Sequence, residues 1–205
     1  MTPDEEWIVP PAGNTLDGDE ELRGLNSTVR DFWRFALGDL RMNNARGYLA
    51  EFIVAKAIGI EDVRRVEWDA YDILWNGITI EVKSSAYLQS WDQRRLSDIR
   101  FSGLKGTRFH PRHDLDPAGK RYNAMVYVFC VQSATSHAGY DQLDIRQWQF
   151  FVAPREKLAA LGYASIGLAS VRRLSGDAVR LDNLAEAITK AAIGQSRDDE
   201  PWWAE

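Results

Sequence analysis

Two acids and a lysine lie within one strand-like stretch of the 205-residue chain, YDILWNGITIEVKSS at residues 71–85. The Asn76-Gly77 pair in its middle strongly predicts a two-residue hairpin turn, because both turn positions need a positive φ. With this pair as the turn, Asp72 lies opposite Glu81, and Lys83 lies two residues further along the same face. The apolar residues alternate onto the other face, so the spacing predicts a hairpin with one charged face and one face towards a core.

The predicted charged face has too little positive charge for two acids. Opposed side chains in an antiparallel pair have Cβ atoms about 5 Å apart, where two carboxylates repel by roughly 3 kcal/mol at an effective dielectric near 20. Lys83 could neutralise one acid on an ordinary solvated face. Alternatively, Mg²⁺ could bind Asp72 and Glu81, since it prefers one or two carboxylates with water and a substrate phosphate. Lys83 would then orient or deprotonate the attacking water, or neutralise the phosphate. The spacing alone leaves both interpretations open.

The elements that must position these residues follow from hydrophobic periodicity. Apolar residues recur at helical spacing over 29–40, and a second helix is predicted over 44–58, where Glu51 is the one acid. Further helices are predicted at 155–162 and 181–192, and strands at 63–68, 71–75, 78–84, 99–101, 122–132 and 148–154. Three tryptophans at periodic apolar positions are expected in the core: Trp33, Trp75 and Trp148.

The formal net charge of −5 is unevenly distributed. Residues 1–21 hold seven acids and no base, and residues 197–205 hold four acids and one arginine, so the rest of the chain carries a net charge of +5. Proline, glycine and acids predict a flexible arm over 1–24, and the acidic end predicts a disordered tail over 197–205. A single domain is therefore expected over 25–196.

A long basic insertion, residues 86–121, interrupts the strand pattern. Its candidate phosphate-binding residues are Arg94, Arg95, Arg100, Lys105, Arg108, Arg112, Lys120 and Arg121. Between residues 94 and 121 these bases outnumber the acids by five. Arg and Lys contacts to phosphate supply most non-specific DNA affinity, and the aromatic residues of the insertion could stack on bases. The alternative is a solvated loop whose aromatic residues pack it down, but the basic stripe favours DNA contact.

Other sequence features restrict the class of protein. The lone cysteine, Cys130, cannot form an intrachain disulfide, and its apolar surroundings predict burial. The start MTPDEEW has no charged-then-apolar leader, and no apolar run approaches the roughly 18 residues of a membrane span. A soluble, cytoplasmic protein without a membrane partner is therefore expected.

A helix with Glu51, followed by D-x8-E-V-K at Asp72, Glu81 and Lys83, is similar to the core of the PD-(D/E)XK nuclease superfamily. The resemblance covers residues 44–154 and implies the restriction-endonuclease-like α/β fold, with a mixed central β-sheet flanked by helices. The proline that usually precedes the first acid is absent here, at a position that varies within the superfamily.

The resemblance also implies roles for individual residues. Asp72 and Glu81 would bind Mg²⁺, or Mn²⁺ as a substitute, together with the carbonyl of Val82. Lys83 would be the catalytic lysine, and Glu51 would reach the same site from its helix, often through water. The sequence after the lysine, SSAYLQSW, resembles a polar segment of some branches, which makes Gln89, Ser84 and Ser85 candidate active-site or phosphate contacts.

Three functional classes follow from these observations. The first is a metal-dependent deoxyribonuclease, for which a homodimer is one expectation, since cutting both strands of a duplex commonly uses two copies. The second is a non-catalytic DNA-binding or complex-forming module on the same fold, although such modules would be expected to have lost a core residue. The third is an unrelated interaction protein, which would leave the combination of Glu51 with the hairpin acids unexplained.

Overall fold

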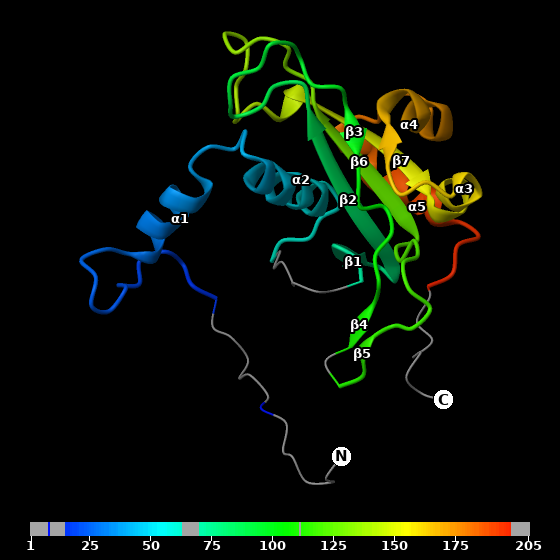
Figure 1. Cartoon of the computed structure of the whole chain (residues 1–205), viewed down its shortest axis with the longest axis horizontal. Helices are drawn as coiled ribbons and strands as arrows, with labels where there is room; N and C mark the ends of the chain where they lie inside the picture. The colour runs from blue at the N-terminus through cyan, green and yellow to red at the C-terminus, as the bar shows by residue number, and fades with distance from the viewer. Residues whose placement is uncertain (1–7, 9–14, 63–69, 111, 198–205) are drawn as a thin grey trace. The chain divides into compact units, whose positions relative to one another are not determined.

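The computed structural model of the chain describes residues 8, 15–62, 70–110 and 112–197 (Figure 1). The chain divides into two compact units, Met1–Asp39 and Leu40–Glu205. The second unit begins at Leu40, whereas the sequence predicts a single domain over 25–196. The predicted strand over 63–68, and most of the predicted arm and tail, lie outside the described residues.

The first unit contains helix α1 (Val29–Leu37), which begins at a capping box. The Thr28 hydroxyl accepts a hydrogen bond from the Asp31 amide, and the Asp31 carboxylate accepts one from the Thr28 amide at 2.9 Å. Reciprocal bonds of this kind satisfy backbone donors that the first helical turn leaves without partners. The predicted helix start is thereby confirmed.

The described residues just before α1 fold onto this helix. The Val29 amide donates to the Glu20 carbonyl at 3.0 Å, and a side chain at Gly18 would collide with the ring of Trp33. Gly18 and Glu20, which lie in the predicted arm, are therefore hydrogen bonded through their carbonyls to the first residues of α1. The prediction of a core position for Trp33 is wrong: it is 38% exposed, because this short segment covers only part of its ring.

The second unit is built around a four-stranded mixed sheet in the order β1-β2-β6-β7. Its strands are β1 (Ile73–Trp75), β2 (Ile78–Ala86), β6 (Val126–Gln132) and β7 (Trp148–Pro154). The β2–β6 pair is parallel, and the β1–β2 and β6–β7 pairs are antiparallel. Two small sheets pair β3 (Arg100–Phe101) with β8 (Ile166–Gly167) and β4 (Phe109–His110) with β5 (Asp114–Leu115).

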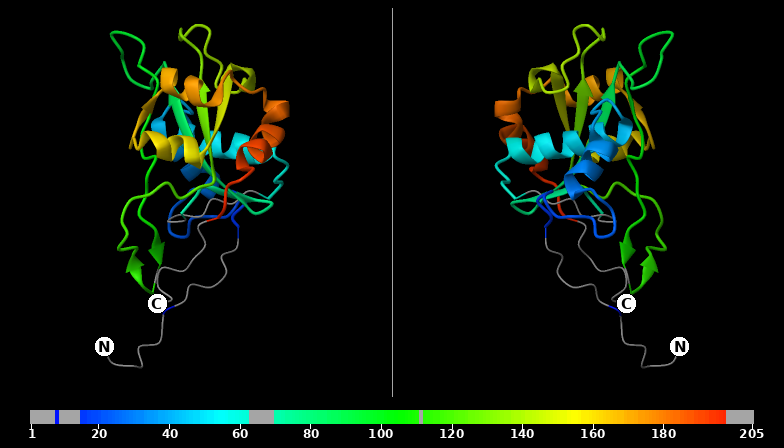
Figure 2. Two further views of the ribbon diagram at one scale, coloured as in Figure 1. Left: turned by 90° about the vertical axis from the view of Figure 1, so that its right-hand side faces the viewer. Right: turned by 90° about the vertical axis from the view of Figure 1, so that its left-hand side faces the viewer.

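Helices cover both faces of the central sheet (Figure 2). The helical segments are α2 (Asn43–Ala57), α3 (Arg155–Leu161), α4 (Leu168–Ser175) and α5 (Leu184–Ala192), with short 3-10 helices η1 (Ile145–Gln147) and η2 (Leu181–Asn183). One apolar core joins a sheet face to α2 and α5, and the other core joins the opposite face to α3, α4, β3 and β8. The predicted mixed sheet flanked by helices is thus confirmed.

Several local expectations can be compared with these elements. Cys130 and Trp148 are buried as predicted, and β7 has the predicted bounds. The helix predicted over 181–192 is divided into η2 and α5, and Asn183 occupies the N-cap of α5. Within the described part of the chain, no helix is long and apolar enough to cross a membrane.

Candidate active site

The β1–β2 hairpin has the register that the Asn76-Gly77 turn predicts. Ile73 pairs with Ile80, Leu74 with Thr79, and Trp75 with Ile78. Both turn residues have positive φ, 49° at Asn76 and 80° at Gly77, as a type I′ turn requires. This register determines which residues of β2 the chain before β1 can reach.

Asp72 lies just outside the ladder, and this differs from the predicted pairing opposite Glu81. Its amide donates to the Ile80 carbonyl at 3.0 Å, because the regular ladder has ended at Ile73. The Asp72 carboxylate instead accepts a hydrogen bond from the Val82 amide at 2.7 Å. The side chain therefore completes the edge of β2 where β1 stops.

Val82 presents its backbone to the same edge. In an extended strand the N–H and C=O of one residue point to the same side, so the Val82 carbonyl is directed to the edge that Asp72 occupies. The Val82 side chain is buried in the first apolar core. The carbonyl thus becomes a potential oxygen ligand beside the carboxylate.

Glu81 and Lys83 form an ion pair on the other face of β2. Their side chains are only 16% and 23% exposed. Glu81 is the register partner of Tyr127 and Lys83 that of Phe129, both of which belong to the second apolar core. The pair therefore stands at the rim of a core rather than on a solvated face.

The environment of Glu81 disfavours its charged form. Burial is the largest cause that raises its pKa from 4.5 to about 7, and the negative charge of Asp72 adds to this increase. The charge of Lys83 and its hydrogen bond act in the opposite direction, and Glu51 raises the pKa slightly further. Lys83 therefore does not offset the combined effect of burial and the neighbouring acids on Glu81.

Glu51 lies on α2, within electrostatic reach of Glu81 but outside a compact ligand group. Among residues 8, 15–62, 70–110 and 112–197, no three His, Cys, Asp or Glu side chains gather to hold a metal ion. Of the predicted metal ligands, the carboxylates of Asp72 and Glu81 and the Val82 carbonyl therefore remain as candidate oxygen donors. Hard oxygen ligands and a shortage of positive charge fit Mg²⁺.

Sequence reasoning missed the segment that lies beside Lys83. A Cβ atom added at Gly103 would lie 4.0 Å from Lys83 Nζ, and Gly103 has a φ of 68°. The next residue, Leu104, accepts a hydrogen bond at its carbonyl from the buried Tyr127 hydroxyl at 3.1 Å. The glycine in SGLKG is a weak sequence signal for this turn. Nothing in the apolar strand sequence around Tyr127 indicates that its hydroxyl would bind this segment.

The two predicted serines lie on different faces of β2. Strand alternation puts Ser85 on the face of Glu81 and Lys83 and puts Ser84 on the opposite face. The structure therefore brings only Ser85 to the side of the ion pair. A role for either serine in binding phosphate stays a prediction.

Gln89 is buried in a network after the end of β2. Its side-chain amide donates to the Ala86 carbonyl at 3.0 Å and to the Ser97 hydroxyl at 3.2 Å, and its oxygen accepts from Arg46 on α2 at 3.4 Å. These bonds hold the loop to α2 rather than to the acids, so its predicted catalytic role has no contact to support it.

The arginines and lysines predicted to contact DNA differ in their interactions within the protein. Arg108 and Arg121 both form ion pairs with the buried Asp116, so part of their charge stabilises the insertion itself. Arg100 donates to Ser165, and Lys105 donates to the Gly162 carbonyl at 2.9 Å. The other four bases are all exposed: Arg94, Arg95, Arg112 and Lys120.

Comparisons with known proteins identify no relative. No protein-family model matches the chain, no curated protein is significantly similar to it, and no solved structure has a significantly matching fold. Any functional conclusion must therefore come from the residues and their geometry.

Proposed function

We propose that the protein is a metal-dependent deoxyribonuclease with a restriction-endonuclease-like core of the PD-(D/E)XK type. One observation supports this proposal: the Asp72 carboxylate accepts from the Val82 amide, and the neighbouring residue Glu81, whose pKa the charge of Asp72 raises, is paired with Lys83. Two acids, a carbonyl and an ammonium within a few residues suit hydrolysis of a phosphodiester.

The oxygen ligands for Mg²⁺ or Mn²⁺ would be Asp72, Glu81 and the Val82 carbonyl, and Glu51, whose charge acts on Glu81, would contribute through water. When bound, the cation would activate the attacking water and stabilise negative charge on the phosphate. The raised pKa of Glu81 supports this assignment, because a neighbouring cation would relieve the cost of its buried charge.

Lys83 would provide the positive group at the scissile phosphate. Its ammonium is held by Glu81 in a partly buried position, where charge interactions are stronger than in water. The absence of a side chain at Gly103 keeps the neighbouring space open.

The proposal is tested by incubating the protein with supercoiled DNA, linear DNA, single strands and RNA in Mg²⁺ or Mn²⁺. Wild type should cut DNA, and Asp72→Asn and Lys83→Ala should lower the rate by at least about 100-fold, since each removes a group that stabilises the transition state. Matched controls are Asp177→Asn and Lys190→Ala, which change exposed residues outside the site and should leave the rate unchanged. Absence of any cleavage by wild type, or equal cleavage by the site variants, would contradict the proposal.

A non-catalytic DNA-binding module on the same fold is the second candidate. The ion pair between Glu81 and Lys83 favours it, because the lysine already has a partner within the protein. This candidate predicts salt-dependent DNA binding that is unaffected by Mg²⁺ and by Asp72→Asn, together with no cleavage.

A further inference from the structure

The buried guanidinium of Arg46 has no acidic partner in the part of the chain that the structure describes. Arg46 lies in the first turn of α2 and is only 6% exposed. Its hydrogen bonds go to three neutral oxygens: the Arg41 carbonyl at 3.0 Å, the Gln89 side chain at 3.4 Å, and the Asn43 side chain. Arginine is rarely buried without an acid, because an unpaired charge loses its hydration and gains no attraction in return.

One donor of this guanidinium is also left over. Within the described residues, nothing accepts a hydrogen bond from the buried Nε of Arg46. A buried donor without an acceptor loses its hydration and gains no bond that replaces it. Burial accordingly lowers the pKa of Arg46, and the phenol of Tyr140 acts more weakly in the opposite direction. Protein groups therefore satisfy neither the charge nor all the donors of this side chain.

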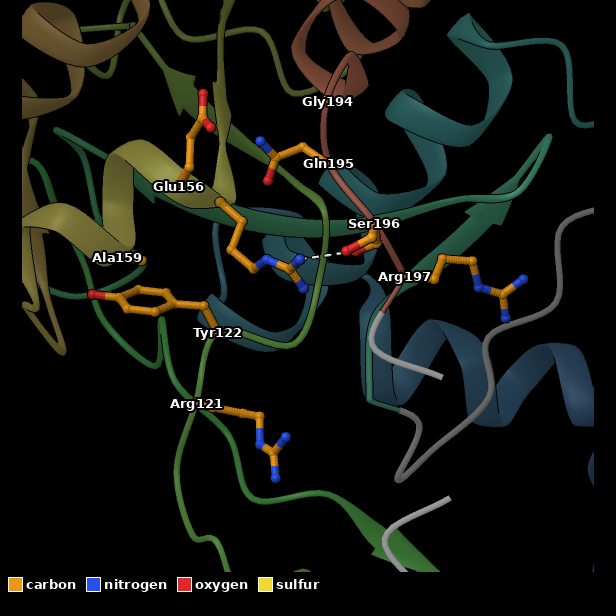
Figure 3. A pocket seen from close by; sticks show the side chains of 9 residues that line it. Arg121, Tyr122, Glu156, Ala159, Gly194, Gln195, Ser196 and Arg197 are labelled. Atoms are coloured by element: carbon orange, nitrogen blue, oxygen red, sulfur yellow. Dashed lines mark hydrogen bonds between the residues drawn. The ribbon is translucent and has the colours of Figure 1, made fainter. Parts of the chain in front are cut away.

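Two other arginines show how such a group is satisfied elsewhere in the chain. In the pocket of Figure 3, the Arg155 guanidinium donates to the Ser196 carbonyl at 2.8 Å and is only half-buried, so water reaches it. Arg108 is more deeply buried, and it forms an ion pair with Asp116. Arg46 has neither the solvent of the first nor the carboxylate of the second.

The position of Arg46 in α2 adds to the cost of its charge. A helix carries a partial positive charge at its N-terminus, where anions are favourable and cations are not. Met42 occupies the N-cap of α2 and makes no side-chain bond to the first turn. The Arg46 amide donates to the Met42 carbonyl at 2.8 Å, so the amides of Asn43, Asn44 and Ala45 precede the helical ladder. An anion at this helix start would therefore offset two unfavourable terms at once.

The guanidinium is directed at this helix start. Long helical side chains lean towards the N-terminus, and Arg46 binds Asn43, the first helical residue, and Arg41, just before the helix. Met42, Asn43 and Asn44 are exposed. An anion can thus approach the first amides of α2 from solvent, and by replacing the Asn43 side-chain oxygen it can reach the guanidinium.

A phosphate group fits this combination of donors better than a carboxylate does. The donors come from the backbone and from a guanidinium, and a terminal phosphate has three oxygens to share between them, whereas a carboxylate has two. We propose that the N-terminus of α2 and the Arg46 guanidinium together bind a phosphate group, either free phosphate or the terminal phosphate of a nucleic acid strand. This site goes beyond the proposed nuclease function and does not depend on it.

The first test compares melting temperatures in sodium phosphate and in sodium chloride, at one pH and one ionic strength. At about ten times the dissociation constant, inorganic phosphate should raise the melting temperature of wild type by roughly 3–6 °C through this site. Phosphate also stabilises proteins by exclusion from their surface, so the decisive quantity is the excess over Arg46→Met, which keeps an unbranched side chain without donors. Equal responses of wild type and Arg46→Met would overturn the site.

The matched control for this charge removal is Arg173→Met. Arg173 is exposed on α4, far along the chain from α2, so its variant should respond to phosphate as wild type does. A loss of the response in Arg173→Met as large as that in Arg46→Met would show that only overall charge matters, and would also overturn the site.

The second test supplies the anion covalently, and it remains informative if Arg46→Met does not fold. The Asn43 side chain already accepts a bond from Arg46, so Asn43→Asp would place a carboxylate against the guanidinium at the start of α2. Its melting temperature in chloride should rise, and its response to phosphate should disappear. Asn183→Asp adds the same charge at the N-cap of α5 and should keep the response. A phosphate response in Asn43→Asp equal to that of wild type would overturn the site.

Oligonucleotides distinguish the two sources of the phosphate. Fluorescence anisotropy without metal compares a strand that carries a 5′- or 3′-phosphate with the same strand ending in hydroxyl groups. If the site holds a strand end, wild type should bind one phosphorylated strand several-fold more tightly, and Asn43→Asp should lose this preference. Equal affinities, together with the melting response to inorganic phosphate, assign the site to free phosphate.

The cleavage assay separates this site from the proposed function. Cleavage of DNA by wild type without any excess phosphate response over Arg46→Met overturns the site and leaves the nuclease intact. An excess response in a protein that cuts no nucleic acid supports the site and overturns the nuclease.

Discussion

The carboxyl group of Glu81 combines two unfavourable conditions, burial and a neighbouring acid. Its ion pair with Lys83 offsets them only in part, so its pKa is raised to about 7 and the group is only partly ionised near neutral pH. A residue that costs stability in its charged form is typical of functional sites, where charge is arranged for a ligand rather than for folding.

The pH dependence of stability follows from the direction of this shift. Below pH 4.5 Glu81 is protonated in both folded and unfolded states; between pH 4.5 and 7 only the folded state keeps the proton. Its contribution to the free energy of unfolding is therefore full below pH 4.5 and falls by up to about 3 kcal/mol as pH rises through 7. In urea titrations Glu81→Gln should gain stability relative to wild type across this window, and Asp177→Asn should not. A constant difference between Glu81→Gln and wild type would contradict the shift.

Cation binding should depend on the same proton. Mg²⁺ competes with it at Glu81, so saturating Mg²⁺ should raise the melting temperature more at pH 8 than at pH 5.5. A concentration 100-fold above the dissociation constant corresponds to about 2.7 kcal/mol of stabilisation. Asp72→Asn should abolish this increase, and the measurement is a thermal melt in Mg²⁺ and in EDTA. An equal Mg²⁺ effect at both pH values would exclude Glu81 as a ligand.

At the scale of elements, the short length of β1 creates the site. Because β1 spans only Ile73–Trp75, the edge of β2 beyond it accepts a side chain in place of a backbone partner. A longer β1 would cover Val82 with ladder hydrogen bonds and would displace Asp72 from its amide. The hairpin turn therefore controls the site through the register it imposes.

Substituting alanine at two glycines, one in the hairpin turn and one in α2, should change the free energy of unfolding in opposite directions. Gly77 has a φ of 80° and no atom within 4 Å of an added Cβ, so Gly77→Ala should cost about 1 kcal/mol through backbone strain alone. Gly47 lies inside α2 with equally open space, so Gly47→Ala should stabilise by up to about 1 kcal/mol. Urea titration measures both changes. Destabilisation by Gly47→Ala would show that steric contacts of the added methyl group outweigh the gain in helix propensity.

Much of the hairpin could be predicted, because its turn dipeptide and alternation are local signals. The final position of Asp72 could not, since it depends on where the ladder ends. Likewise, Arg108 and Arg121 read as DNA contacts in the sequence, but the buried Asp116 that binds both of them becomes visible only after the insertion folds. The partial exposure of Trp33 depends on which segment covers its helix, which periodicity does not report.

At the scale of the whole molecule, the boundary between the two units also separates an acidic part of the chain from a slightly basic one. Residues 1–39 carry nine acids and three bases, so the rest of the chain has a net charge of +1. Both apolar cores lie within the second unit, Leu40–Glu205. This unit therefore has the burial expected of a domain that folds by itself.

Removal of residues 1–39 should increase DNA affinity, because it removes a net charge of −6. The increase should be several-fold at about 50 mM salt and should shrink at about 200 mM, where screening is stronger, as anisotropy titrations would record. A circular dichroism melt of the shortened chain checks that it still unfolds cooperatively. Affinity unchanged at low salt would show that these acids do not influence the DNA-binding surface.

The parallel pairing of β2 with β6 has a consequence for folding kinetics. Ile80 and Val126 are neighbours in the sheet but distant in the chain, so their pairing must first overcome the entropy of closing a long loop. The hairpin needs no such closure and can form within about 1–10 μs. The hairpin can therefore form while Glu81 is still in water, and the burial that raises the pKa of Glu81 follows only when β6 pairs with β2. Proton uptake near neutral pH would accordingly report the late step of folding.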